Sequence, residues 1–238
     1  MQGWCNGDQM KYGIYFLVLA ALMLSIAIQF GGWYWTMIYP ASSFAIVAIG
    51  YLGVGPRVFG KDSSGKRSLV AKIFLFPYLV FTMATWHLVR LLSQESAVDM
   101  VDPDLFLSRR LLSDELPNGV KTVVDLTCEF TDPTFACENY LCFPTLDASC
   151  PTADELKELA EQILTFPMPV LIHCAQGHGR TGLVACAVLL ASAKASSPTE
   201  ALALLKASRP GIELNAVQRK TLDLLRMRSS VDQCGTRN

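Results

Sequence analysis

Residues 169–194 read PVLIHCAQGHGRTGLVACAVLLASAK, and this stretch decides the fold. Pro169–His173 is a short apolar run, as expected of a buried strand. Thr181–Lys194 is apolar and rich in alanine and leucine, as expected of a helix. A strand that passes through a short loop into a helix is the building unit of α/β proteins with a mainly parallel sheet. We therefore expect an α/β domain around this unit.

The sequence on both sides supplies further strands and helices. Thr152 and Glu155 form a capping box, which predicts a helix that runs to about Phe166. Ser197 and Asn215 begin two later helices in the same way, and the last of them ends near Met227. Further strands are expected at Asp104–Leu107, Val120–Leu126 and Tyr140–Phe143.

The loop between the central strand and helix carries a cysteine and an arginine in the spacing Cys174-x5-Arg180. A loop that closes into a helix N-terminus points backbone N–H groups at one spot, and the helix dipole adds positive potential there. Gly177 and Gly179 allow the backbone to turn tightly. A cysteine in such a field loses its proton readily, and an arginine offers a planar pair of donors to phosphate oxygens. The loop therefore suits a phosphoryl group that is attacked by sulfur.

The stretch from His173 to Gly182 resembles the HCxxGxxR[S/T]G motif of cysteine-dependent protein tyrosine phosphatases. The short domain looks like the dual-specificity branch of that family, and the resemblance spans roughly Asp104 to Met227. It implies a dual-specificity-phosphatase-like sheet flanked by helices and a two-step reaction through a phosphocysteine. By position, Cys174 matches the nucleophile and Arg180 the phosphate clamp.

The same resemblance assigns the remaining loop residues. Thr181 matches the hydroxyl that helps to expel the cysteine thiolate, and His173 matches the histidine that orders the loop. No metal ion and no cofactor are implied. The phosphate-binding residues carried over by position are Ala175, Gln176, Gly177, His178, Gly179 and Arg180.

A general acid must protonate the leaving oxygen, and the family takes an aspartate from a loop upstream of the motif. Asp147 fits this place, because it follows a predicted strand and precedes the capped helix. Asp154 and Glu155 are alternatives, although carboxylates in a first helical turn more often interact with the helix dipole. Asp125 ends a predicted buried strand, where structural hydrogen bonds are the expected role.

Charge divides the chain of 238 residues, of which 51% are hydrophobic, near residue 90. Residues 1–89 hold six basic and two acidic residues, whereas the rest holds 14 basic and 19 acidic residues. We expect a membrane anchor over residues 1–98 and a dual-specificity-type phosphatase domain over residues 99–238. The net charge of −1 argues against a nucleic-acid partner, which requires a basic surface.

The 45 residues from Tyr12 to Pro56 contain no charged side chain, which is enough for two membrane spans. We place these spans at about 14–30 and 36–54, as a helical hairpin. A third apolar helix is expected at about 69–92, where Lys72 and Arg90 would share one face. It either lies at the interface or spans the bilayer, and the side on which the catalytic domain lies depends on this choice.

We expect a multi-pass integral membrane protein whose catalytic domain is cytoplasmic. The basic loop 55–68 favours that side, and a catalytic thiolate needs a reducing compartment. The eight cysteines include no Cys-x-x-Cys pair, so a structural zinc site is not expected. The roles of Cys128, Cys137 and Cys150 stay open, and Cys142 is a candidate for a disulfide with Cys174 under oxidation.

The predicted function is a membrane-anchored phosphatase that hydrolyses phosphomonoesters. Phosphotyrosine, phosphoserine and phosphothreonine in proteins are the default substrates of the resembled family. A phospholipid at the bilayer surface is the alternative substrate, because the anchor raises the local concentration of lipid. An inactive module that binds phosphate is the alternative without catalysis, and the intact Cys174, Arg180 and Thr181 argue against it.

Overall fold

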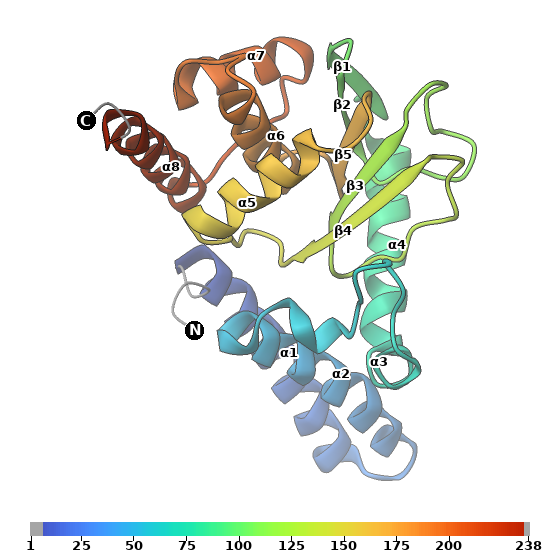
Figure 1. The fold of residues 1–238 in the computed structure, drawn as a ribbon. Helices are drawn as coiled ribbons and strands as arrows, with labels where there is room; N and C mark the ends of the chain where they lie inside the picture. The colour runs from blue at the N-terminus through green and yellow to red at the C-terminus, as the bar shows by residue number, and fades with distance from the viewer. Residues whose placement is uncertain (1–6, 236–238) are drawn as a thin grey trace.

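The computed structural model describes residues 7–235, and its centre is a sheet of five strands in the order β1-β2-β5-β3-β4 (Figure 1). β2, β5, β3 and β4 run parallel, whereas β1 pairs with β2 in the antiparallel sense. This is the expected α/β architecture. The strands are β1 (Val98–Asp102), β2 (Leu105–Arg109), β3 (Thr122–Thr127), β4 (Asn139–Thr145) and β5 (Val170–Cys174).

The two faces of the sheet are covered differently. Val124, Leu126 and Ile172 face the main hydrophobic core, which the C-terminal helices complete. Val123 and Leu171 face the other way, toward apolar side chains of the loops that connect the strands. Alternate residues of one strand thus face opposite layers, and both layers are apolar, which explains why β3 and β5 are buried along their whole length.

One helix lies between β4 and β5 in the chain, and three more follow β5. All four lie on one side of the sheet (Figure 1). The capping box of Thr152 and Glu155 is formed, and Ser197 caps the next predicted helix through the Glu200 amide. The central helix begins at Gly179, two residues before the predicted start. The helices are α5 (Ala153–Leu164), α6 (Gly179–Ala191), α7 (Pro198–Ser208) and α8 (Ala216–Gly235).

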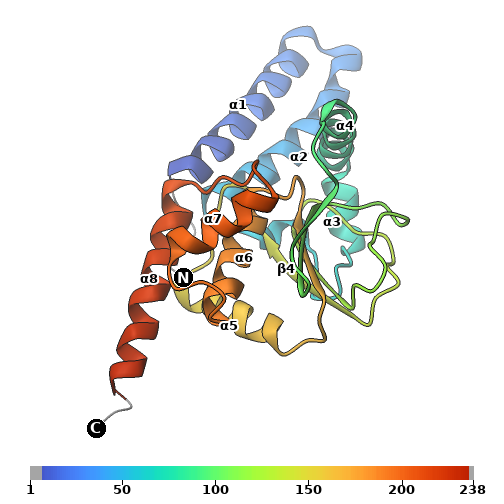
Figure 2. The same cartoon turned by 90° about the horizontal axis from the view of Figure 1, so that it is seen from above.

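The N-terminal part is a pair of long apolar helices that lie side by side and project from the sheet domain (Figure 2). The first is α1 (Gly7–Phe30), and the second combines η1 (Gly32–Met37), α2 (Ile38–Ile49) and η2 (Gly50–Val54). Gly31, with a φ of 59°, separates them. Among the described residues, Gln9–Phe30 and Gly32–Val54 are long and apolar enough to cross a membrane, a statement that rests on length and composition.

The third apolar segment is not the single helix expected over residues 69–92. It forms α3 (Leu69–Phe74) and α4 (Phe76–Leu92), which meet at Leu75. Pro77 has no N–H to donate to Ile73 O four residues earlier, and the Tyr39 hydroxyl donates to that oxygen instead, at 2.5 Å. The break means that Lys72 and Arg90 do not share the face of one continuous helix.

The N-terminal helices and the sheet domain share one hydrophobic cluster. Phe44, Tyr51 and Phe59 of the N-terminal part pack there with Cys128 and Leu146, which follow β3 and β4. η3 (Pro56–Phe59) carries the last of these aromatic residues. The apolar helices therefore pack against the C-terminal edge of the parallel strands, which is the edge that ends in Cys174.

Candidate active site

Cys174 is the last residue of β5, and the chain turns from it directly into α6. Its side chain is buried, and the backbone N–H of Gly177 donates to its Sγ at 3.3 Å. Gly177 has a φ of +75°, and a Cβ there would lie 2.5 Å from Ser108 O. A side chain would therefore be both strained and in collision with the neighbouring strand, so the tight course of the 174–180 loop requires glycine at this position.

Arg180 lies in the first turn of α6 and is held by a carboxylate that sequence reasoning did not find. Its Nη1 and Nη2 donate to the two carboxylate oxygens of Glu129 at 3.0 and 2.6 Å, and Nη1 also donates to Thr145 O at 2.9 Å. Burial alone would raise the pKa of Glu129, but Arg180 outweighs it and lowers this pKa. The only available sequence signal was a carboxylate just after a fully buried strand.

Asp147, the predicted general acid, lies close to the same arginine, Arg180. Its Oδ1 is 3.4 Å from Arg180 Nε, and its side chain is 57% exposed. Since Glu129 and Thr145 take three of the five N–H groups of Arg180, the Nε–H and one Nη2–H remain. Those two N–H groups form one edge of the guanidinium, and this edge suits two phosphate oxygens.

His173 and Thr181 flank this arrangement, and both are completely buried. His173 Nε2 lies 2.9 Å from Asp132 Oδ2 and 3.9 Å from Asp125 Oδ1. Burial alone would lower the pKa of His173, but Asp132, helped by Asp125, raises it to about 9. The Thr181 hydroxyl has no hydrogen-bond partner among the described residues, so it is available to a group bound in the loop.

The outer side of the 174–180 loop is fixed by residues from distant parts of the chain. Trp86 of α4 donates its Nε1–H to Ala175 O at 3.0 Å. Arg209 donates to the carbonyl oxygens of Gly177 and Gln176 at 2.9 and 3.0 Å. His178 Nε2 lies 2.6 Å from Glu95 Oε2. The loop carbonyls thus point outward to donors, which leaves amide groups for the side of Cys174.

The turn that carries Asp147 is tied to the start of α8. The side chains of Asn215 and Gln218 each accept a hydrogen bond from the backbone N–H of the other residue, which forms the predicted cap of α8. Both side chains also donate to the turn that carries Asp147. Asn215 Nδ2 donates to Ala148 O at 3.0 Å, and Gln218 Nε2 donates to Ser149 O at 3.3 Å. Asp154 and Glu155, the alternatives to Asp147, lie in the first turn of α5, where Glu155 closes the capping box.

The strand order argues against the candidate disulfide between Cys142 and Cys174 under oxidation. Cys142 lies opposite Asp125 on β3, and Asp125 lies opposite His173 on β5, so the two cysteines are separated by a whole strand. Neighbouring strands are about 4.8 Å apart, and a disulfide cannot bridge two such spacings. Burial raises the pKa of Cys142 to about 12, so its thiol is also poorly reactive.

Asp125, Asp132 and His173 are the described residues whose donor atoms are close enough to share a metal ion. Two observations argue for a different role. The Lys61 ammonium contacts Asp125 Oδ2, and Asp132 lies 2.9 Å from His173, so the carboxylates already have cationic partners. The donor set thus fits an internal ionic network better than a metal site.

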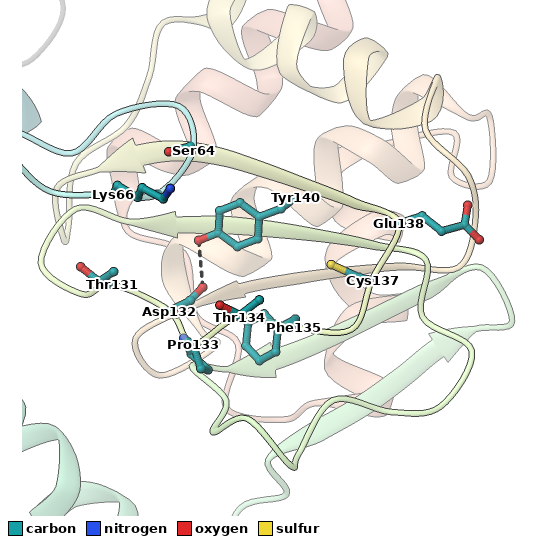
Figure 3. A pocket seen from close by; sticks show the side chains of 11 residues that line it. Ser64, Lys66, Thr131, Asp132, Pro133, Thr134, Phe135, Cys137, Glu138 and Tyr140 are labelled. Carbon is teal, nitrogen blue, oxygen red and sulfur yellow. Dashed lines mark hydrogen bonds between the residues drawn. The ribbon is translucent and has the colours of Figure 1, made fainter.

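A pocket of about 400 Å³ lies beside this network rather than at Cys174 (Figure 3). Ser64 and Lys66 border it on one side, and Asp132 and Tyr140 lie in its wall. The Tyr140 hydroxyl oxygen lies 3.1 Å from Asp132 Oδ2, the contact that is drawn as a dashed line in Figure 3. No residue of the 173–182 stretch lines this pocket, so it is separate from the candidate active site.

Comparison with known proteins agrees with this geometry. Residues 110–194 match a family model described as "Polymorphic toxin system, DSP-PTPase phosphatase". No curated protein sequence matches the chain. Human DUSP28 is a similar solved structure, with 20% identity, a TM-score of 0.51, and coverage of 57% of this chain and 97% of that one.

Two further solved structures show the same likeness. A mouse putative dual specificity phosphatase, crystallised with zinc tungstate, is 19% identical with a TM-score of 0.51, covering 59% of this chain and 95% of that one. PTPMT1 is 18% identical with a TM-score of 0.50, and the match covers 58% of this chain and 99% of that one. The domain has the dual-specificity phosphatase fold.

Proposed function

We propose that this chain is a membrane-anchored phosphatase that hydrolyses phosphomonoesters through a phosphocysteine intermediate. The observation that carries the proposal is the edge of Arg180 that Glu129 and Thr145 leave unbound, in a chain segment whose Gly177 amide already donates to the Cys174 sulfur. Sulfur and phosphate oxygens need the same donors, so one loop serves both.

In the first step, the Cys174 thiolate attacks phosphorus and forms an S–P bond, while the P–O bond to the leaving group breaks. Asp147 protonates the leaving oxygen, and the free edge of Arg180 binds two of the phosphoryl oxygens. In the second step, water attacks phosphorus and gives a proton to Asp147, and the S–P bond breaks. The Thr181 hydroxyl, unpartnered among the described residues, donates to the departing sulfur.

Hydrolysis of para-nitrophenyl phosphate by the full chain in detergent tests this mechanism. Cys174→Ser should abolish turnover, and Asp147→Asn should lower kcat and remove the basic limb of its pH profile. Asp154→Asn is the matched control and should behave as wild type. Equal activity of wild type and Cys174→Ser would instead support the inactive phosphate-binding module.

Two features support a membrane anchor with the catalytic domain on the side of the N-terminus. Gln9 near the start of α1 donates to Tyr51 O near the end of the second apolar helix, so both ends lie together. The α3–α4 segment has both ends on the sheet domain, since Arg67 donates to Cys128 O and Arg90 pairs with Glu115. This segment therefore enters and leaves on one side, and the domain is proposed to be cytoplasmic.

The topology can be tested with a membrane-impermeant maleimide on sealed vesicles, after Cys5, Cys137, Cys174 and Cys234 are replaced by serine. Ser63→Cys lies in the loop before α3, and Thr36→Cys lies in the turn after Gly31. We expect the two cysteines to be labelled from opposite sides of the bilayer. Labelling of both from one side would contradict the two spans.

The proposed substrates are phosphoproteins, as is usual for enzymes of this fold. A phospholipid is the second candidate, favoured by one observation: the apolar helices pack at the edge of the sheet that ends in Cys174. Asp147→Ala protein in lipid nanodiscs, offered phosphopeptides and phosphorylated lipids together, separates the two. Retention of lipid alone would exclude the protein substrate.

A further inference from the structure

Lys61 lies inside the molecule although it belongs to the polar loop between the second apolar helix and α3. Its side chain has no exposed surface. The ammonium group contacts Asp125 Oδ2, and it donates to Thr127 O at 2.8 Å and Thr127 Oγ1 at 3.2 Å. All three N–H groups therefore have acceptors, which is the condition under which a buried ammonium is tolerated.

This ammonium is part of a chain of contacts that leads to Cys174. Asp125 lies in register with His173 on the neighbouring strand, and its Oδ1 is 3.9 Å from His173 Nε2. Asp132 is the second carboxylate on the same imidazole, at 2.9 Å. His173 therefore has two carboxylates close to its imidazole and is the residue before Cys174, with whose sulfur its charge interacts.

We propose that Lys61 is a positioning residue of the Cys174 site: it neutralises Asp125, so that the positive charge of His173 is not cancelled by two carboxylates and remains available to the sulfur. The charge count supports this. Lys61, His173 and Arg110 together contact the two carboxylates Asp125 and Asp132, so the loss of Lys61 removes one of three positive charges from this network. The loss of a positive charge near the sulfur disfavours its anionic form.

The charge states on which this count depends are supported by the surroundings of each group. Burial opposes the charge on Lys61, but Asp125 outweighs it and raises the pKa of this lysine. Burial likewise opposes ionisation of Asp132, but His173 outweighs it and lowers the pKa of this aspartate. Asp125 accepts hydrogen bonds from Thr127 N and from the Tyr140 hydroxyl, each at 2.7 Å, and its Oδ2 contacts the Lys61 ammonium.

Other charged residues lie on the elements around Cys174, and all of them are present in every variant compared below. They are His173 on its own strand, Arg109 opposite it on β2, Glu129 after β3, Asp147 after β4 and Arg180 on α6. Arg110 completes the set behind the histidine, with Nε 3.3 Å from Asp132 Oδ1.

The test measures alkylation of Cys174 by iodoacetamide as a function of pH, in the full chain in detergent, with the modified peptide followed by mass spectrometry. Lys61→Met should move the pH midpoint of alkylation upward, and Asp125→Asn should move it downward. The double variant should return close to wild type. At an effective dielectric constant of about 20, a charge about 10 Å away corresponds to a change of about one pH unit.

Lys66→Met is the matched control, because Lys66 lies in the same loop but is exposed, and it should leave the midpoint unchanged. A merely structural role of Lys61 would move both single variants in the same direction or neither, and either result would overturn the proposal. If Lys61→Met does not fold, Asp125→Asn and the double variant decide. The alkylation midpoint of the double variant should then be higher than that of Asp125→Asn, and equal midpoints of these two variants would overturn the proposal.

This inference rests on the proposed function only for the role of Cys174 as a thiolate. Alkylation needs no turnover, so the two can fail separately. If the alkylation midpoints of Lys61→Met and Asp125→Asn shift in opposite directions but the chain hydrolyses no phosphomonoester, the role of Lys61 is supported and the proposed function is contradicted. An active enzyme without these shifts would support the proposed function and contradict the role of Lys61.

Discussion

At the scale of single residues, the guanidinium of Arg180 is oriented before any phosphate is bound. Glu129 binds its Nη1 and Nη2 side by side, and Thr145 O takes a further N–H, so the group cannot rotate freely. The remaining edge faces Asp147. Pre-orientation of this kind lowers the cost of ordering a binding group during the reaction.

Glu129→Gln should therefore damage both stability and catalysis. Removal of one partner of a buried ion pair typically costs about 3–5 kcal/mol, because the other charge is left uncompensated. We expect a clearly lower thermal unfolding midpoint and a loss of kcat/KM of at least about tenfold. Glu138→Gln, at an exposed position, is the control and should leave both quantities unchanged.

The buried imidazole of His173 predicts a particular dependence of stability on pH. Its pKa in the folded protein is about 9, above the ordinary value of 6.5, so its contribution is fully present below about pH 6.5. The contribution is lost as the pH rises through 9 and is on the order of 3 kcal/mol. Thermal unfolding between pH 6 and 10 should show this decline. The His173→Asn variant should lack it, and an equal decline there would contradict the assignment.

The sequence motif predicted which residues of the 174–180 loop come together, because they are neighbours along one strand, loop and helix. Asp147 was also predictable, since the capping box of Thr152 and Glu155 fixes where the preceding loop ends. Glu129 was missed because 51 residues separate it from Arg180, and Lys61 because 64 residues separate it from Asp125. Pairing over such distances depends on how the strands and the N-terminal loop pack, which no local pattern records.

At the scale of elements, α4 has a different environment at each end. Tyr78 and Phe81, near its start, make edge-to-face contacts with Phe44 of α2, with ring centroids 5.7 and 5.6 Å away. Trp86, two turns later, donates to Ala175 O in the 174–180 loop, and the Arg110 guanidinium lies 5.0 Å from the centre of the Trp86 ring. One rigid helix therefore joins the apolar helices to the candidate active site. Hydropathy alone could show that this segment is apolar but not that it breaks at Leu75.

Trp86→Phe should retain most of the ring packing while it removes the N–H donated to Ala175 O. Ala175 O keeps the Arg110 amide, at 3.2 Å, so we expect a loss of stability of only about 1 kcal/mol. The larger effect should be on kcat, because the loop loses its contact with α4. Trp33→Phe is the control, since Trp33 is 84% exposed. Equal kinetics of the two variants would show that the contact does not position the loop.

At the scale of the whole molecule, the apolar helices and the sheet domain are parts of one folded unit. Phe59 is completely buried in the cluster that also holds Cys128 and Leu146. Charge placed a division near residue 90, and the predicted domain boundary follows residue 98; β1 begins at Val98. Charge and hydropathy could not reveal the shared core, because a side chain buried against protein and one buried in lipid have the same composition.

Phe59→Ala should destabilise the sheet domain although the residue lies outside it. Truncation of a buried phenylalanine typically costs about 3–5 kcal/mol. We expect a lower thermal unfolding midpoint, recorded by limited proteolysis within residues 99–225 of the full chain in detergent. Phe74→Ala, at a position that is 54% exposed, should have little effect. An unchanged midpoint in Phe59→Ala would mean that the two parts unfold independently.

Leu146 is buried among the apolar helices, and the next residue along the chain is Asp147. The proposed proton donor is thus attached to the part of the molecule that would feel the thickness and lateral pressure of a bilayer. A thinner or more tightly compressed bilayer that tilts α1 and α2 would pull on the turn at Asp147. Turnover by the same protein should then vary with the acyl-chain length of the lipids around it, even when the substrate is water-soluble.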